Sequence, residues 1–400
     1  MVTGPGPTKD DVWTPKDESL DAGDADVVRV TGSAPGPSTG WRGRAERLLA
    51  LTSPWGRWWI DRAEAAALTQ IAKQRHDVVY TWMQPYESVE LGARLARQTG
   101  LPWIADFGDP WGLDEMAVYP TALHRAAEKR RMGRLLRHAS AIVMSTPEAL
   151  RRLHDAFPEL RRIPSISSPV GYDAADFGAA LPPREAPGTE RFRIVHTGYL
   201  HTADGLRLRR TSRFRRLLGG RLDNVDILTR SHVYLLRAVA AARHAQKTPI
   251  EVVLAGVLSD DDMRIAADYD EVTLMGYVPH RETARLMQSA DLLFLPMHDL
   301  PSGVRAGLVP GKTYEYLASR RPILAAVPEG DARDLLLEAG SAFVCAPSDV
   351  EAMAEIICEQ IARRKRGEPS PRPREDVLAR YERSLQAQQL AELFDQVARR

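Results

Sequence analysis

The feature that most constrains the fold is a regular alternation of short apolar runs with longer helical patterns. In the first half of the chain, the apolar runs 77–82 and 140–146 alternate with helical patterns at 87–100 and 121–138. The same alternation resumes at residue 192 and continues to the end of a long helical pattern near residue 365. Strands separated by helices pair in parallel and are covered by those helices on both faces. The sequence therefore predicts an α/β protein with parallel sheets.

The two series are separated by a stretch with the composition of a linker. Residues 180–190, "ALPPREAPGTE", are rich in proline and contain a glycine, which favours an irregular connection. We therefore divide the chain into a first domain, 1–182, a second domain, 190–372, and a carboxyl-terminal segment, 373–400. One helix is expected over 375–399, packed back across the domain boundary. Two facing α/β domains place a ligand between the carboxyl ends of their sheets.

Composition excludes several classes of protein. The 54 basic residues nearly balance the 53 acidic ones, which argues against a dedicated nucleic-acid binder. The basic residues are almost all arginine, which indicates a GC-rich bacterial genome. No apolar run reaches the length of a membrane span, and no signal peptide is visible. Cys345 and Cys358 have no metal-ligand spacing, so we expect a reducing, cytoplasmic location. Peripheral contact with the inner face of a membrane is left open.

Two glycine turns follow strands of the second domain and are candidates for a ligand site. Gly198 lies in "HTGYLH", where the absence of a Cβ lets backbone approach a ligand. Gly276 and Tyr277 follow another strand, where exposed backbone groups can read the edge of a flat base. Taken alone, each of these features is more often an ordinary tight turn.

The stretch "PGKTYEYLASRRPIL", residues 310–324, combines a chain break, a helix start and a buried strand. Free N–H groups at a helix start favour anions, and Lys312 adds a positive charge suited to phosphate. Glu315 lies about one turn further on the same face, where its carboxylate can accept hydrogen bonds from a vicinal diol. The alternative is a solvated ion pair between Lys312 and Glu315, which would contribute only a few tenths of a kcal/mol.

The order of these pieces resembles the retaining glycosyltransferases of family 4, which have the two-domain GT-B fold. The resemblance covers roughly residues 75–360, and "KTYEYLASRRPIL" is its most specific part. It also includes "RIVHTGYL", "VVLAGV" and "VTLMGYVPHRETARLMQSADLLFLPM" in the second domain. In the first domain, "DVVYTWMQPYES", "GLPWIADFGDPW", "SAIVMST" and "SPVGYDAADF" follow the family's order. The resemblance implies a GT-B architecture whose last helix crosses back to the first domain.

The resemblance also implies roles for individual residues. It assigns Glu315 to the ribose diol of a nucleotide donor and Tyr277 to the border of the base. The turn from Gly307 to Gly311, with Leu308 and Val309 inside it, would offer amides to the diphosphate and sugar. Arg230, in "LTRSHVY", is our candidate for the arginine that clamps the diphosphate. On the acceptor side, Asp109 or Asp106 would orient the acceptor or the sugar, although both also fit a pair that caps a strand end.

The chain departs from the family pattern in three places. The family has two glutamates eight positions apart, and here Gly307 stands where the first would be. Gly108 or Asp109 occupies the region where the family often has a histidine. An insert at 201–229 carries seven arginines, which fit either an acceptor or phosphate surface or a solvated loop.

The beginning of the chain also differs from the expected pattern. A first domain of this type opens with an apolar strand, a glycine turn and a helix, whereas Val2 and Thr3 have the pattern of the end of a second strand. Roughly forty residues are therefore expected to be absent before Met1. Such an absence would leave an empty strand position, an unpaired strand edge and exposed apolar surface.

Together these features predict a retaining glycosyltransferase that uses a nucleotide diphosphate sugar. The acceptor is expected to be a glycan, a lipid-linked molecule or a natural product. No metal or other cofactor is expected, because Arg230 and Lys312 can stabilise the leaving diphosphate. Two alternatives remain: an inactive relative that binds a partner enzyme, and a sugar-nucleotide epimerase of the same fold.

Overall fold

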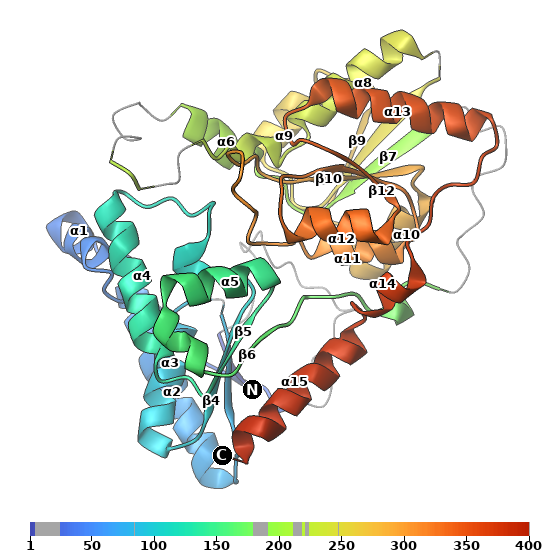
Figure 1. Ribbon diagram of the computed structural model, residues 1–400. Helices are drawn as coiled ribbons and strands as arrows, with labels where there is room; N and C mark the ends of the chain where they lie inside the picture. Colours follow the sequence, from blue (N-terminus) through green and yellow to red (C-terminus); the bar gives the residue numbers. More distant parts are fainter. Residues whose placement is uncertain are drawn as a thin grey trace.

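The computed structural model contains two α/β domains and a helical carboxyl-terminal segment (Figure 1). It describes residues 1–4, 25–83, 85–178, 191–210, 218–220, 224–246 and 248–399. The expected linker at 180–190 lies outside these residues, as does part of the arginine-rich insert. Within the described residues, no helix is both long and apolar enough to cross a membrane.

The carboxyl-terminal domain has one continuous parallel sheet of six strands in the order β12-β11-β10-β7-β8-β9. Its strands are β7 (Phe192–Thr197), β8 (Ile250–Ala255), β9 (Val272–Gly276), β10 (Leu292–Pro296), β11 (Ile323–Ala326) and β12 (Ala342–Cys345). The chain order reverses between the central strands β7 and β10. Ligands of such sheets bind at this switch point, beyond the carboxyl ends of the strands.

Helices cover both faces of this sheet, as predicted (Figure 1). They are α6 (Thr202–Arg209), α8 (Val233–Ala245), α9 (Asp260–Ala266), α10 (His280–Ser289), α11 (Lys312–Ala318), α12 (Asp331–Ala339) and α13 (Val350–Lys365), with the short 3-10 turn η4 (Ile227–Thr229). Successive side chains of β10 enter different cores: Leu293 and Leu295 pack with α11 and α12, whereas Phe294 packs with α8 and α13. This alternation explains why the strand is apolar at every position.

The amino-terminal domain has a smaller, divided sheet. Four parallel strands pair in chain order: β3 (Val79–Trp82), β4 (Trp103–Phe107), β5 (Ala141–Met144) and β6 (Ser165–Ser167). A separate parallel pair consists of β1 (Val2–Thr3) and β2 (Val28–Arg29). The helices are α1 (Gly40–Leu48), α2 (Pro54–Lys73), α3 (Ser88–Thr99), α4 (Ala122–Leu136) and α5 (Pro147–Ala156), with 3-10 turns η1 (Trp111–Leu113), η2 (Pro158–Arg162) and η3 (Ala174–Asp176). Helix α1 was not predicted from the sequence.

A cavity of about 580 Å³ lies between the two parts of this sheet. Its walls include Val2 and Thr3 of β1, Tyr80 and Trp82 of β3, and Leu91 of α3. Strands β1 and β3 belong to different sheets. The cavity therefore separates β1 from β3.

The carboxyl-terminal segment crosses back to the amino-terminal domain, as predicted, but as two helices instead of one (Figure 1). Helix α14 spans Glu375–Ala379 and α15 spans Arg383–Ala398. The single helix expected over 375–399 is wrong because the backbone at Tyr381 and Arg383 pairs with Tyr172, at N···O distances of 3.0 and 2.9 Å. Beyond this break, Leu393 and Val397 of α15 pack against the face of β4 and β5.

Candidate functional site

Two basic side chains, Lys312 and Arg230, meet beyond the carboxyl ends of β7 and β10 of the carboxyl-terminal domain. Lys312 is the first residue of α11, and its Nζ lies 3.2 Å from Nε2 of His196 at the end of β7. Gly198 leaves room for this side chain, since a Cβ there would lie 2.9 Å from Nζ of Lys312. Gly198 also has φ +95°, which favours glycine. The predicted residues Gly198, Arg230 and Lys312 are therefore brought together.

The protonated form of Lys312 is disfavoured by its surroundings. Burial and, to a smaller extent, the positive charge of Arg230 together lower the pKa of Lys312 to about 7, although Glu315 opposes the shift. Burial likewise lowers the pKa of Arg230. Two cations that share a poorly solvated site favour a bound anion, because an anion offsets both desolvation and mutual repulsion.

The neighbouring histidines are neutral and do not add to this charge. His196 is buried, its Nδ1 donates to the carbonyl oxygen of Phe294 at 3.0 Å, and its Nε2 accepts from Lys312. Burial, with the charge of Lys312, holds the pKa of His196 well below its ordinary value. Burial and the charge of Arg230 lower the pKa of His201 to about 3. The positive charge at the site therefore comes from Lys312 and Arg230.

An acidic loop of the amino-terminal domain faces Arg230. Asp109, Asp114 and Glu115 all favour the charged form of Arg230 electrostatically, and its Nη1 lies 3.5 Å from Sδ of Met116. Burial raises the pKa of Asp114 to about 7, and the nearby carboxylates of Glu115 and Asp109 contribute to this shift. A carboxyl group that titrates near neutrality can exchange a proton with a bound ligand. The two domains thus bring opposite charges to the same place.

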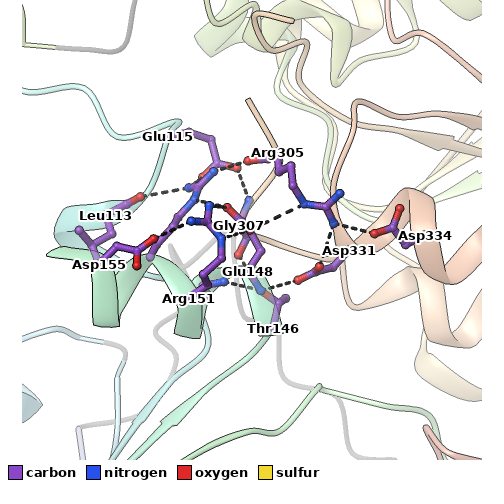
Figure 2. Close-up of polar contacts among 12 residues, drawn as sticks. Leu113, Glu115, Thr146, Glu148, Arg151, Asp155, Arg305, Gly307, Asp331 and Asp334 are labelled. Carbon is purple, nitrogen blue, oxygen red and sulfur yellow. Dashed lines mark hydrogen bonds and ion pairs between the residues drawn. The ribbon is translucent and has the colours of Figure 1, made fainter. Parts of the chain in front are cut away.

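Glu115 links this loop to the carboxyl-terminal domain through a buried polar network, part of which Figure 2 shows. Its carboxylate accepts from the Gly307 amide at 2.8 Å, from His298 at 3.2 Å and from Arg152 at 2.5 Å. Burial alone would raise the pKa of Glu115, but His298 and Arg152 outweigh it and hold this pKa at about 2. Glu115 is therefore a permanent anion that binds the loop 305–311 to the amino-terminal domain.

Gly307 occupies a place that has no room for a side chain. A Cβ at this position would lie 2.7 Å from Nη1 of Arg152, which belongs to the amino-terminal domain. The Gly307 carbonyl oxygen also accepts from Oγ1 of Thr146 at 3.0 Å. The side chain of Arg152 therefore stands where the first glutamate of the family pattern would begin. This packing gives a physical reason for the glycine.

A second group of ion pairs closes the same interface (Figure 2). The backbone amide of Glu148, in the first turn of α5, donates to Asp331 at 2.7 Å. Arg305 lies between the domains, 3.3 Å from Asp331 and 2.6 Å from Asp334, with Glu148 at 3.7 Å. Arg305, at the start of loop 305–311, thus lies between charged groups of α5 on one side and of α12 on the other.

Glu315 lies in a different charged cluster, one turn along α11. Burial raises its pKa, while His280, Arg383 and Lys312 oppose that shift. His280 in turn lies 2.7 Å from Asp176. Segments of both domains and the start of α15 therefore converge around this carboxylate.

The remaining predicted residues lie at different depths. Leu308 is buried and Val309 packs beside it in the core under α11, so this turn has only backbone groups to offer a ligand. Gly311 immediately precedes α11. Tyr277 follows Gly276, which has φ +67°, and is 44% exposed.

The structure separates the two acceptor-side aspartates. Asp109 follows the end of β4 and faces Arg230. Asp106 lies within β4, where its carboxylate accepts the hydroxyl hydrogen of Tyr80, whose ring packs against Phe394 of α15. Burial raises the pKa of Asp106 to about 6. Asp106 therefore belongs to the face under α15 and is not part of the Arg230 cluster.

Sequence reasoning missed several members of the site. His196 was visible only as one residue of the strand "FRIVHT", and Asp114 and Glu115 followed the predicted Asp109 in the same exit loop. Arg152 and His298 are far apart in sequence and carried no motif that points to Glu115. Among the described residues, no three His, Cys, Asp or Glu side chains gather as metal ligands.

Comparison with known protein families gives a match for the region that holds Lys312. Residues 218–363 match the family model described as "Glycosyl transferases group 1". Over these residues the chain is similar to the group 1 glycosyl transferases. The matched region contains Arg230, Tyr277, Gly307, Lys312 and Glu315, so it includes most of the predicted donor site. A search of curated protein sequences gave no match.

Solved structures share the fold over most of this chain. Sucrose-phosphate synthase from Thermosynechococcus elongatus is 16% identical, with a TM-score of 0.57, and the match covers 88% of this chain and 79% of that protein. HepE of Anabaena, in complex with UDP and glucose, is 14% identical, with a TM-score of 0.58 and coverage of 93% and 86%. A glycosyltransferase from Rickettsia africae is 13% identical, with a TM-score of 0.58 and coverage of 93% and 84%. The predicted GT-B fold is confirmed, and the match over residues 218–363 agrees with the predicted likeness to glycosyltransferases, whereas family 4 and retention stay predictions.

Proposed function

We propose that this protein transfers a sugar from a nucleotide diphosphate sugar to an acceptor, with retention of configuration. The observation that carries the proposal is the pair of partly buried cations Lys312 and Arg230: desolvation lowers the pKa of both, and the charge of Arg230 contributes to the shift of Lys312. A diphosphate would neutralise both charges. The group 1 match supports the reaction class, and the Anabaena neighbour was solved with UDP and glucose.

We assign the parts of the donor to the residues around this pair. Lys312 and Arg230 hold the diphosphate, and Gly198 keeps backbone close to it. The amides of the turn at Leu308 and Val309 contact the diphosphate and the sugar. Glu315 accepts hydrogen bonds from the ribose hydroxyls, and Tyr277 borders the base. Because Glu315 is partly buried, its carboxylate gains more from such hydrogen bonds than an exposed one would.

The proposed reaction needs only groups that the site contains. The bond between the anomeric carbon and the diphosphate oxygen breaks, and negative charge develops on that oxygen. Lys312 and Arg230 stabilise this charge. The acceptor hydroxyl attacks the anomeric carbon from the same face, and the departing phosphate oxygen takes the hydroxyl proton. Asp109 orients the acceptor from the amino-terminal domain. No metal ion takes part in this scheme.

Donor binding is the first experiment. Isothermal titration with UDP, GDP, ADP and their glucose conjugates should show binding of one nucleotide family. Arg230→Gln and Lys312→Met should each weaken that binding about ten- to a hundredfold, the effect of removing a hydrogen bond to a charged group. Arg372→Gln and Lys365→Met remove exposed charges of the same kinds in the same domain and serve as matched controls. Equal affinity in the site variants and the controls would contradict the assignment.

Turnover is the second experiment. Donor hydrolysis and transfer to mixed acceptors can be followed by release of nucleoside diphosphate, and NMR of the product reports the anomer. Asp109→Asn should lower turnover at least tenfold while donor affinity stays nearly unchanged. A product of inverted configuration would exclude retention, and a loss of donor affinity in Asp109→Asn would move this residue to the donor site.

A second candidate is a donor-binding protein that does not transfer the sugar. The specific observation in its favour is Gly307, whose surroundings are filled by Arg152 where the family pattern has a glutamate. This candidate predicts tight nucleotide binding with neither hydrolysis nor transfer. The two experiments together separate it from the enzyme.

A further inference from the structure

Helix α1 and the turn after it expose large apolar side chains to solvent. Trp41 is 76% exposed and Leu49 is 63% exposed, and Leu48 and Leu51 are also exposed. Tryptophan and leucine are normally buried in a soluble domain. Such a concentration within eleven residues indicates a surface that contacts something other than water.

The opposite side of α1 is attached to the amino-terminal domain, where the helix packs against α4. Gly43 is buried against the segment that precedes the helix, since a Cβ there would collide with the carbonyl oxygen of Ser38. Glu46 forms an ion pair of 3.2 Å with Arg57 of α2. The helix is thereby held with its apolar residues outward.

The outer face combines these apolar side chains with arginine. Trp41, Arg44 and Leu48 are spaced at i, i+3 and i+7, which places them on one side of the helix, and Arg42 and Leu49 flank that side. Helix α1 carries three exposed arginines, Arg42, Arg44 and Arg47, and one acidic residue, Glu46, which is paired with Arg57 of α2. The face is therefore both apolar and cationic.

The neighbouring helix α4 extends this surface. Helices α1 and α4 pack against each other at one side of the amino-terminal domain (Figure 1). Leu123, in the first turn of α4, is 69% exposed, and Arg130 and Arg134 follow it at i+7 and i+11. The same combination of leucine and arginine thus recurs on the adjacent element.

We propose that this surface, formed by α1, its following turn and the exposed stripe of α4, docks the protein on an anionic phospholipid membrane. Tryptophan prefers the headgroup level of a bilayer, leucine enters the acyl boundary, and arginine reaches lipid phosphates with its stem along apolar surface. A nucleic acid would not require the leucines, and the cationic charge argues against apposition of two copies of this face. The proposal does not depend on the reaction that the protein catalyses.

Vesicle flotation with the full chain tests this proposal directly. The protein should float with vesicles of phosphatidylcholine and phosphatidylglycerol, and much less with phosphatidylcholine alone. Added salt should weaken the binding, because part of the attraction is electrostatic. Equal recovery with both kinds of vesicle, or no flotation with either, would overturn the proposal.

Two sets of variants assign the binding to this surface. Changing Arg42, Arg44 and Arg47 together to glutamine should weaken binding to the anionic vesicles about a hundredfold, from roughly fivefold for each arginine. A control triple changes exposed arginines of the other domain to glutamine, at Arg237, Arg285 and Arg372. Because net charge falls equally in both triples, equal losses would show that only overall charge matters and would overturn the proposal.

A second set of variants tests whether the exposed apolar side chains contribute to membrane binding. Trp41→Ser combined with Leu49→Ser should weaken vesicle binding at least tenfold, whereas Leu337→Ser, at a 56% exposed position of α12, should not. Nucleotide affinity and the circular dichroism spectrum report whether the variants fold. If the double variant floats like the parent, or if it changes only the oligomeric state in size-exclusion chromatography, the membrane proposal is wrong.

Discussion

The two domains have the same α/β architecture, but their sheets differ in continuity and packing. The sheet of the carboxyl-terminal domain is continuous over six strands, and both of its faces are packed with buried side chains. The amino-terminal sheet is divided into four strands and two, with a cavity of about 580 Å³ between the parts. A continuous sheet can hold side chains rigidly at its carboxyl edge, whereas a divided one leaves unpaired edges and unfilled volume.

The candidate site reflects this difference. Lys312, His196 and Gly198 are placed by the ends of packed strands and by α11 of the continuous domain. The amino-terminal domain contributes Asp109 and Glu115 from one exit loop. We infer that the carboxyl-terminal domain fixes the donor geometry, and that the other domain contributes through loops held by the interface network.

The largest expected effect tests whether the two cores differ in stability. Phe294→Ala in the fully buried strand β10 should destabilise the protein by about 4 kcal/mol, because the tightly packed surroundings cannot collapse around the lost ring. Leu91→Ala lines the existing cavity and should cost about 2 kcal/mol, because this leucine already lacks neighbours on one side.

Urea denaturation gives the two free energies of unfolding, and peptide-resolved hydrogen exchange shows which domain opens. Leu337→Ala, at an exposed position, is the control and should be nearly neutral. Equal costs for Phe294→Ala and Leu91→Ala would show that the cavity does not weaken its surroundings.

The fold was largely predictable because its signals are local. The runs "DLLFLPM" and "PILAAVP" could only be buried strands, and Gly100, with φ +71°, ends α3 where the sequence predicted. The break between α14 and α15 could not be predicted, because it is caused by pairing with Tyr172, some two hundred residues earlier in the chain. Helix α1 was missed because its apolar residues face outward, so they lack the pattern of a helix that packs on a core.

The next effect concerns the contact between the domains. Glu115→Ala should destabilise the contact between the two domains by about 3 kcal/mol, which is at the lower end of the cost of breaking a buried ion pair. The cost is limited because Arg152 keeps a second partner in Glu148, at 3.1 Å, and His298 is neutral without Glu115. The Gly307 amide, which loses its acceptor, should exchange its hydrogen faster.

Hydrogen exchange of the peptide that contains Gly307 and the denaturation midpoint measure the two consequences. Glu159→Ala, an exposed acidic residue of the same domain, is the matched control. If Glu115→Ala resembles this control, the network does not join the domains.

The site was less predictable than the fold. Lys312 and Gly198 could be grouped from the sequence because both come after strands of one sheet, whereas Arg230 was assigned through the resemblance to a known family. The network of Glu115, Arg152 and His298 depends on how the two domains meet, and no local pattern encodes that orientation. The position of Asp106 could have been predicted from strand periodicity. Its side chain must point to the same face of β4 as that of Ile104, the face that α15 covers.

A smaller effect is the pH dependence of stability that the titration of Lys312 causes. Its pKa is about 7 in the folded protein and 10.5 when unperturbed, so the unfolded chain binds more protons between these values. Stability should therefore rise with pH over this window, by a total on the order of a few kcal/mol. Lys312→Met should be more stable than the parent at pH 6, and this advantage should disappear toward pH 10. A constant difference at all pH values would contradict the low pKa.

Donor affinity should depend on pH in the opposite direction. A diphosphate binds the protonated lysine, so affinity should fall by up to tenfold for each pH unit above about 7. Arg230, His196, His201 and Glu315 face the same group, but neither histidine is protonated in this range. Titrations of the parent and of Lys312→Met at several pH values measure the slope, which should be absent in the variant.

The smallest effect asks whether the amino-terminal cavity can be filled. Ala67 of α2 is partly buried and lines the cavity, so Ala67→Leu adds apolar volume where no neighbour has to move. Burial of the added carbons should stabilise the protein by about 1 kcal/mol after the entropy of the new side chain is subtracted. Ala65→Leu, at an exposed position of the same helix, has the same change in helix propensity without the cavity contact. The difference between these two variants in urea denaturation therefore isolates the cavity. If Ala67→Leu stabilises the protein relative to Ala65→Leu, the amino-terminal domain comes closer to the packing of the carboxyl-terminal domain. If it destabilises the protein, the cavity walls are rigid and do not fit a leucine side chain.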